Sequence, residues 1–89
     1  MFYTYILYSS KYDRFYIGQC EDVAVRLLRH NNSGVPSTKP YRPWELVYYE
    51  EYASRAEASK RELEIKKKKS RKYIEFLVNG GGTGKHVPM

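Results

Sequence analysis

Residues 15–30 constrain the fold of this chain more than any other stretch. The stretch opens with Phe15, Tyr16 and Ile17, residue types that favour a pleated, half-buried strand. Gly18 follows, and a glycine lets the chain turn or lets another group approach the backbone closely. The sequence therefore predicts the end of a strand at this point, with a turn or a close contact directly after it.

The second half of this stretch predicts a helix with one basic face. Asp22 is a suitable N-cap. The apolar stripe behind it has helical spacing and consists of Val23, Ala24, Leu27 and Leu28. Arg26 and His30 are four residues apart and share a face at the edge of that stripe, with Arg29 nearby. A strand-end tyrosine, a glycine and a basic helix face together indicate a phosphate-binding site.

Length and composition narrow the class of protein. A chain of 89 residues forms one domain with a modest core, without room for a large internal cavity. A net charge of +6 favours polyanionic partners. Cys20 is the only cysteine, which excludes a disulfide framework and a cysteine-based zinc site. We find neither a signal peptide nor a membrane-spanning apolar run, so we expect a cytoplasmic protein without a membrane partner.

The pattern along the chain predicts an α+β fold, with a small three-stranded antiparallel sheet flanked by three helices. Alternating apolar and aromatic residues place strands near residues 2–8, 14–19 and 45–52. Apolar stripes and cap residues place helices near residues 22–32, 54–67 and 70–78. Gly34 suits a left-handed residue at the end of the first helix. Residues 1–79 form the expected domain, and the glycine-rich residues 80–89 are expected to be a flexible tail without a role in the fold.

Two basic segments each have two interpretations. The proline-rich residues 35–44, which include Lys39, are either a plain connection or a loop on the ligand side. The lysine run is either a solvated helix end or a phosphate-binding surface, and the number of neighbouring cations favours the second interpretation. The run consists of Lys66, Lys67, Lys68 and Lys69.

Glu62 lies at a position of the second helix that should face the sheet. Ala58, Glu62 and Ile65 follow the helical spacing of one face. A carboxylate on such a face is costly unless a cation or hydrogen-bond donors accompany it. Helix geometry alone favours a structural ion pair with Lys66, four residues later, over a functional role.

The ordered set of these motifs resembles the GIY-YIG nuclease family. The set is Tyr3-Thr4-Tyr5, Tyr16-Ile17-Gly18, Arg26, His30 and Arg61-Glu62. The resemblance covers about residues 2–77 and is closest to small stand-alone bacterial members, which are similar to the nuclease domain of the excision-repair incision subunit. Two departures stand out. Tyr3 occupies the place of the first glycine in the motif name, and Gln19 occupies a place where the excision-repair relatives carry a lysine.

The resemblance implies a metal-dependent endonuclease that hydrolyses phosphodiester bonds in DNA, with RNA as the alternative substrate. The residues that match catalytic positions of the family are Tyr5, Tyr16, Arg26, His30 and Glu62. Glu62 would hold one Mg²⁺ or Mn²⁺, hard ions that prefer oxygen ligands. We expect nucleic-acid contacts from Gln19, Arg29, Lys39, Arg61, Lys66, Lys67, Lys68, Lys69 and Arg71.

Phosphodiester hydrolysis gives each matched residue a role. It needs an activated water, neutralisation of the phosphate charge and help for the leaving oxygen. Tyr16 is the expected general base, Arg26 the phosphate ligand, and Tyr5 the group that positions Tyr16 or the water. From residue pattern alone, the favoured interpretation of the two tyrosines is core packing, each with its hydroxyl at the rim, and the family resemblance turns the balance toward catalysis.

Two rival hypotheses remain open at the level of the sequence. One is a non-catalytic nucleic-acid-binding module, and the other is a subunit that is active only with a protein partner. A pure binding module would not need Glu62, which repels phosphate unless a metal ion intervenes. For the enzyme, the resemblance, which extends to eukaryotic structure-specific junction nucleases, implies a structure-specific activity in DNA repair or recombination.

Overall fold

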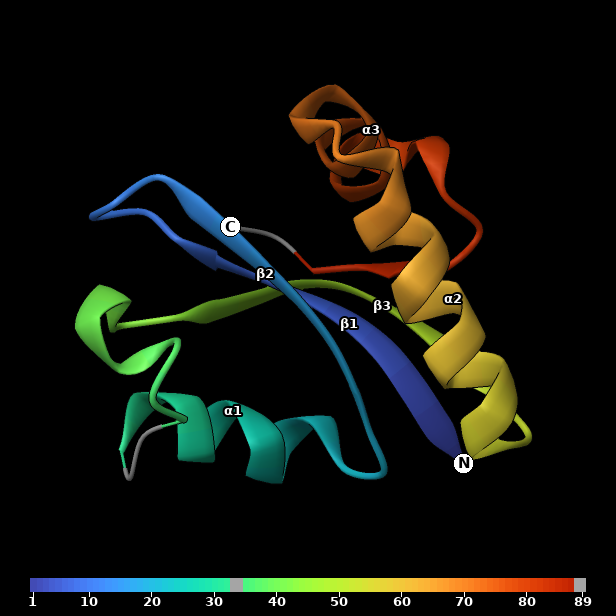
Figure 1. Cartoon of the computed structure of the whole chain (residues 1–89), viewed down its shortest axis with the longest axis horizontal. Coiled ribbons are helices and arrows are strands. Elements are labelled where there is room, and N and C mark those ends of the chain that lie inside the picture. The colour runs from blue at the N-terminus through green and yellow to red at the C-terminus, as the bar shows by residue number, and fades with distance from the viewer. Residues whose placement is uncertain (33–34, 88–89) are drawn as a thin grey trace.

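A computed structural model describes residues 1–32 and 35–87 of the chain, and it has an α+β fold (Figure 1). The strands are β1 (Phe2–Ser9), β2 (Arg14–Cys20), β3 (Glu45–Tyr52) and β4 (Lys85–His86). The α-helices are α1 (Val23–Asn31), α2 (Arg55–Lys68) and α3 (Arg71–Phe76). A 3-10 turn, η1 (Lys39–Tyr41), precedes β3, and a π-helical turn, η2 (Leu77–Gly81), follows α3. None of the helices in the described ranges is long and apolar enough to cross a membrane.

The sheet has four strands in the order β2-β1-β3-β4, and every neighbouring pair is antiparallel. The prediction of three strands was therefore wrong. The fourth strand is Lys85–His86, which pairs with Tyr48 and Tyr49 of β3. The prediction that residues 80–89 have no role in the fold is corrected for this part of the segment, while Pro88 and Met89, like Gly34, lie outside the described residues.

Each helix begins where a side-chain cap predicts it. Asp22 accepts a hydrogen bond from the backbone N–H of Val25 at 3.1 Å and so caps α1. Ser54 accepts from the backbone N–H of Glu57 at 3.2 Å and caps α2. Ser70 caps α3 in the same way. These bonds satisfy N–H groups that have no partner within the first turn of a helix.

The two faces of the sheet bury different halves of the core. Successive side chains of a strand point to opposite faces, so Tyr5 and Leu7 of β1 pack on the α1 side and Ile6 packs on the α2 side. Figure 1 shows α1 on one side of the strands and α2 on the other. β2 lies at one edge of the sheet, between these two helices. Side chains from both helices can therefore meet at the edge formed by β2.

Candidate active site

Tyr5 of β1 lies across Gly18 of β2, its partner in the antiparallel register. A Cβ atom at Gly18 would lie 2.5 Å from the Tyr5 hydroxyl oxygen and 2.6 Å from the ring carbon that carries it. Only a residue without a side chain leaves room for the phenol here. Tyr5 is consequently buried, with 1% of its surface exposed, and the close approach predicted at Gly18 is confirmed.

A chain of hydrogen bonds runs inward from the Tyr5 hydroxyl. The hydroxyl lies 3.0 Å from His30 Nε2, and His30 Nδ1 lies 2.8 Å from Thr38 Oγ1. The Thr38 hydroxyl donates its proton to the carbonyl of Val35 at 3.1 Å, so its oxygen accepts from His30 Nδ1. With the proton on Nδ1, Nε2 accepts from Tyr5. We call Tyr5, His30 and Thr38 the phenol–imidazole chain.

The phenol–imidazole chain is uncharged. Burial lowers the pKa of His30, and the cations of Arg26 and Arg29 lower it further, so the imidazole is neutral near pH 7. Burial raises the pKa of Tyr5 well above its usual range, so its phenol stays protonated. Tyr5 is therefore a hydrogen-bond donor to His30 and is unsuited to act as a base itself.

Tyr16 of β2 packs its ring beside this chain. The Tyr16 ring centroid lies 4.9 Å from that of His30, 6.2 Å from that of Trp44 and 6.3 Å from that of Tyr5. These contacts fix the ring, which is partly exposed. In contrast to Tyr5, the Tyr16 hydroxyl has no hydrogen bond to any residue in the described parts of the chain. It is the phenol at this site that is available to a ligand or a water molecule.

A cation and a carboxylate flank the two tyrosines. The charge of Arg26 on α1 lowers the pKa of Tyr5, and the charge of Glu62 on α2 raises it, both as smaller influences than burial. Both charged groups therefore lie close enough to act on the Tyr5 phenol. Of the five residues predicted to be catalytic, Tyr5, Tyr16 and His30 are in direct contact, while Arg26 and Glu62 act on the Tyr5 phenol through their charges.

The Glu62 carboxylate is largely shielded, with 19% of its side chain exposed, and it pairs with Lys66 at 2.5 Å. The ion pair predicted from helix geometry is therefore present. Within residues 1–32 and 35–87, no group of three or more His, Cys, Asp and Glu side chains is arranged to hold a metal ion. A single carboxylate suits Mg²⁺ or Mn²⁺, which keep several waters and take further oxygen ligands from a bound phosphate. The donor chemistry at Glu62 is compatible with such an ion.

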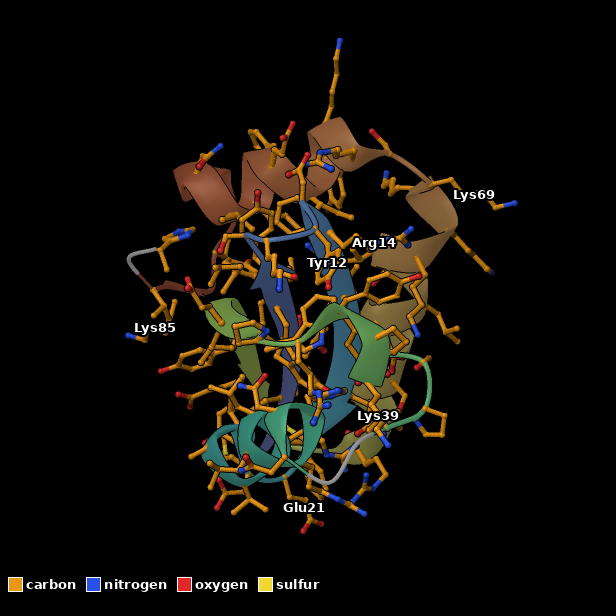
Figure 2. The ribbon with its side chains drawn as sticks, turned by 90° about the vertical axis from the view of Figure 1, so that its left-hand side faces the viewer. Tyr12, Arg14, Glu21, Lys39, Lys69 and Lys85 are labelled. Atoms are coloured by element: carbon orange, nitrogen blue, oxygen red, sulfur yellow. The ribbon has the colours of Figure 1, made fainter. Side chains whose placement is uncertain are left out.

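The residues predicted to contact nucleic acid fall into two groups. Those whose exposed side chain has no hydrogen bond or ion pair to another described residue are Arg29, Lys39, Lys67, Lys68 and Lys69. Lys69, at the end of α2, projects away from the body of the molecule in Figure 2. The other group consists of Gln19, Arg61, Lys66 and Arg71, whose side chains are already bound to protein groups.

Arg71 has two roles in packing that the sequence did not indicate. Its guanidinium pairs with Asp13 in the turn between β1 and β2 and lies 5.1 Å from the ring centroid of Phe15. It also pairs with Glu75 at 3.4 Å, four residues later in α3. Arg71 thereby ties α3 to the β1–β2 turn, and a phosphate would have to compete with two carboxylates for its charge.

Arg61 is part of a buried cluster on the α2 face of the sheet. It donates to Glu50 Oε1 at 2.9 Å and to Oε2 at 3.3 Å, and Glu50 is 5% exposed. Both carboxylate oxygens also accept a phenol hydroxyl, from Tyr52 and from Tyr48. Burial raises the pKa of Glu50, but these donors outweigh burial and the net pKa is lowered. We call Glu50, Arg61, Tyr48 and Tyr52 the Glu50 cluster, and it fixes α2 on the sheet.

Sequence reasoning missed Thr38, Glu50 and Arg55. Nothing local marks Thr38 as the partner of a histidine on a different element, because the loop between them sets that contact. Glu50 had a signal, since the alternation of β3 places it on the same face as Tyr48 and Tyr52. Arg55 lies at the start of α2, where nothing local indicates that its guanidinium reaches Gln19 at 3.1 Å and Glu21 at 3.0 Å.

Comparison with known proteins gives two concordant results. The family model described as the GIY-YIG catalytic domain matches residues 1–74. A UPF0213 protein of Staphylococcus epidermidis is 42% identical over 66 residues, which is 73% of this chain and 80% of the relative. A UPF0213 protein of Staphylococcus saprophyticus is 38% identical over 79 residues, 88% of this chain and 95% of the relative. No solved structure matches the chain.

Proposed function

This chain belongs to the GIY-YIG family of nucleases, and we propose that it is a divalent-metal-dependent endonuclease that hydrolyses phosphodiester bonds in DNA. One observation carries the proposal. Tyr16 presents a hydroxyl without a partner among the described residues, beside the neutral phenol–imidazole chain, and the charges of Arg26 and Glu62 act on the Tyr5 end of that chain. In this proposal Tyr16 is the base, Arg26 the phosphate ligand and Glu62 the metal ligand.

Tyr16 acts as the general base in this proposal. A phenol with a pKa of about 10 is only about one part in a thousand ionised at pH 7, so nearby positive charge must favour the phenolate. Arg26 is the cation on the protein that can provide part of this charge. Tyr16 first releases its own proton to solvent, and the phenolate then takes the proton of the attacking water and becomes a neutral phenol again.

The phenol–imidazole chain orients Tyr5 for the same step. The Tyr5 proton is committed to His30 Nε2, at 3.0 Å, so the lone pairs of the Tyr5 oxygen remain to accept a hydrogen bond. That acceptor can hold the Tyr16 hydroxyl or the attacking water. Because His30 is neutral, it does not attract the negative charge of the phosphate or of a Tyr16 phenolate toward itself.

Arg26 and Glu62 deal with the charge of the phosphate. Arg26 neutralises the non-bridging oxygens as negative charge builds up on them. Glu62 is the residue that would hold one Mg²⁺ or Mn²⁺, which when bound supplies Lewis acidity at the phosphate oxygens. Lys66 has to share or release the Glu62 carboxylate when the ion binds, and its charge is then free for the DNA backbone.

The Glu62–Lys66 ion pair also supports a second candidate function. A carboxylate neutralised by a lysine no longer repels phosphate strongly, so the same fold could bind nucleic acid without a metal and without turnover. We regard this binding module, alone or as part of a partner-dependent enzyme, as the alternative. For the enzyme we propose branched or flapped DNA as the substrate, in repair or recombination.

The test is incubation of the purified chain with labelled linear, nicked, flapped and branched DNAs, in Mg²⁺, in Mn²⁺ and in chelator. We expect cleavage that requires the metal and that is abolished in Glu62→Gln, which keeps the shape of the side chain and loses its charge. DNA binding of that variant in chelator should hold or improve. Metal-dependent cleavage that persists in a folded Glu62→Gln would contradict the assignment, and no cleavage of any DNA by the unmodified chain would favour the binding module.

A further inference from the structure

A hollow of about 200 Å³ lies beside the candidate active site, where β2 ends between α1 and the start of α2. Arginine side chains dominate its wall, with Arg26 and Arg29 from α1 and Arg55 from α2. The remaining lining residues are Cys20, Glu21, Asp22 and Val25. Guanidinium groups bind phosphate through paired, charge-assisted hydrogen bonds, and three of them around one hollow indicate an anion site.

The two carboxylates at the hollow, Asp22 and Glu21, differ in how strongly they are bound to other protein groups. Asp22 is committed to the backbone as the cap of α1, accepting from Val25 at 3.1 Å. Glu21 pairs with Arg55 at 3.0 Å, and both side chains are more than half exposed, at 63% and 53%. Exposed ion pairs of this kind contribute little stability, so a phosphate can take the place of Glu21.

Arg55 is held in position for such an exchange. Its Nη1 donates to Gln19 at 3.1 Å, and its guanidinium lies 5.0 Å from the ring centroid of Phe2. These contacts fix the direction of the side chain without neutralising it. Arg26 and Arg29 form no ion pair within the described part of the chain, so the three arginines leave the hollow with a net positive charge.

The Cys20 end of the hollow and Tyr16 lie at different places along β2. Tyr16 and Cys20 are four residues apart on the same strand, which corresponds to about 13 Å. The phosphates of one DNA strand repeat about every 3.4 Å along the helix axis, so this separation corresponds to a few nucleotides. Figure 2 also places Glu21 and Lys69 at opposite ends of the molecule, which separates the hollow from the lysine run.

We propose that this hollow is a second phosphate site, in which Arg29 and Arg55 bind a DNA backbone phosphate a few nucleotides from the bond that is cleaved. Glu21 occupies Arg55 in the free protein and gives it up when DNA binds. Arg26 lies at the border between this site and the catalytic centre. The inference rests on the proposed function, because it assumes that the scissile phosphate lies at Tyr16.

The experiment measures the salt dependence of DNA affinity in chelator for the unmodified chain, Arg29→Gln, Arg55→Gln and Lys85→Gln. Lys85 is the matched control, because it is exposed on β4 at the opposite edge of the sheet. Each lost phosphate contact should lower the log–log slope by about 0.7 for single strands and about 0.9 for duplex DNA. We expect that loss for Arg29→Gln and Arg55→Gln and none for Lys85→Gln.

Two further variants separate a phosphate contact from a folding defect. Arg55→Lys keeps the charge and should retain most of the slope. Glu21→Gln should raise the affinity, and the gain should shrink in the Arg55→Gln background because part of it comes from releasing Arg55. Slopes of Arg55→Gln and Arg29→Gln equal to that of Lys85→Gln would overturn the second phosphate site.

Failure of this inference is distinguishable from failure of the proposed function. If the unmodified chain cleaves DNA while the two arginine variants keep its full salt slope, the nuclease proposal stands and the second site is rejected. If the chain does not cleave any DNA while both variants lose slope, the phosphate site stands and the nuclease proposal is rejected.

Discussion

Two buried polar clusters lie on opposite faces of the sheet and differ in charge. The phenol–imidazole chain, on the α1 face, consists of neutral groups linked by single hydrogen bonds. The Glu50 cluster, on the α2 face, contains a carboxylate that accepts from a guanidinium and two phenols. The phenol–imidazole chain is uncharged and lies beside the candidate site. In the Glu50 cluster every charged group is paired, and this cluster lies away from Tyr16.

This difference in charge corresponds to two roles. The phenol–imidazole chain belongs to the reaction site, and the Glu50 cluster positions its residues. The phenol–imidazole chain begins at Tyr5, beside the Tyr16 ring, so its open end lies at the candidate site. The Glu50 cluster is closed, because each carboxylate oxygen already accepts two donors. Arg61 directly precedes Glu62 in α2, so a cluster that fixes Arg61 also fixes the place of Glu62. The charged cluster stabilises the arrangement in which the neutral chain can act.

The largest effect on stability should come from breaking the Glu50 cluster. Arg61→Gln leaves a buried carboxylate without its cation, which typically costs about 3–5 kcal/mol, and the lower end applies because Arg61 is partly exposed. Urea unfolding followed by circular dichroism measures the loss. Arg71→Gln is the control, since its ion pairs are exposed and its loss should be small. An equal effect of both variants would contradict a special role for the Glu50 cluster.

The next effect should come from opening the phenol–imidazole chain. Tyr5→Phe leaves buried Nε2 of His30 without a donor, at a cost of about 1–3 kcal/mol in stability. Its cleavage rate, corrected for the folded fraction, should also fall, because Tyr5 positions the reacting groups. Tyr52→Phe removes a phenol from the Glu50 cluster and should leave the corrected rate unchanged. If Tyr5→Phe and Tyr52→Phe have equal corrected cleavage rates, the two clusters do not differ in their role in cleavage.

The two clusters should titrate in different pH ranges. The folded pKa of His30 lies below its ordinary value of 6.5, so the unfolded chain binds the proton more readily and stability falls as the pH drops below about 6.5. Glu50 has a folded pKa below its ordinary 4.5, so its contribution is present above that pH and is lost below it. Each proton contributes a slope of at most about 1.4 kcal/mol per pH unit.

Unfolding free energies measured between pH 8 and pH 3 check this prediction. His30→Gln should remove the step near pH 6.5 and keep the lower one. His86→Gln is the control, because His86 is exposed on β4 and should leave both steps in place. A step near pH 6.5 that survives in a folded His30→Gln would assign it to another group.

The smallest effect should come from the lysine run outside both clusters. Replacing Lys67, Lys68 and Lys69 with alanine should leave stability and the catalytic step nearly unchanged, because these side chains are exposed. The log–log salt slope of DNA binding should fall by at most about 0.9 for each lost phosphate contact. An unchanged slope would show that this run is a solvated helix end.

The part of the fold that could be predicted rests on local signals. Asp22 and Ser54 mark helix starts because a cap acts within three residues, and Gly18 marks a close approach because no other residue fits beneath Tyr5. The strand Lys85–His86 was missed because two residues carry no periodicity, and their pairing depends on β3, which is far away in the sequence.

The candidate site was predictable to the extent that the family resemblance covered it. Arg61 was assigned to DNA because charge is readable from sequence, whereas its buried partner Glu50 is eleven residues away on another element. Thr38 and Arg55 were missed for the same reason, since each acts on a residue brought near only by the fold. Sequence pattern predicted the candidate side chains, and the fold shows which of them already have protein partners.

The most direct test of the account is the single-turnover cleavage rate of Tyr16→Phe at saturating DNA and metal. The variant loses one hydroxyl and keeps the ring that packs against His30 and Trp44, so a melting curve should show a folded protein. We predict a rate at least about 10²-fold below that of the unmodified chain, with DNA affinity nearly unchanged. A folded Tyr16→Phe that cleaves at the unmodified rate would contradict the assignment of Tyr16 as the base.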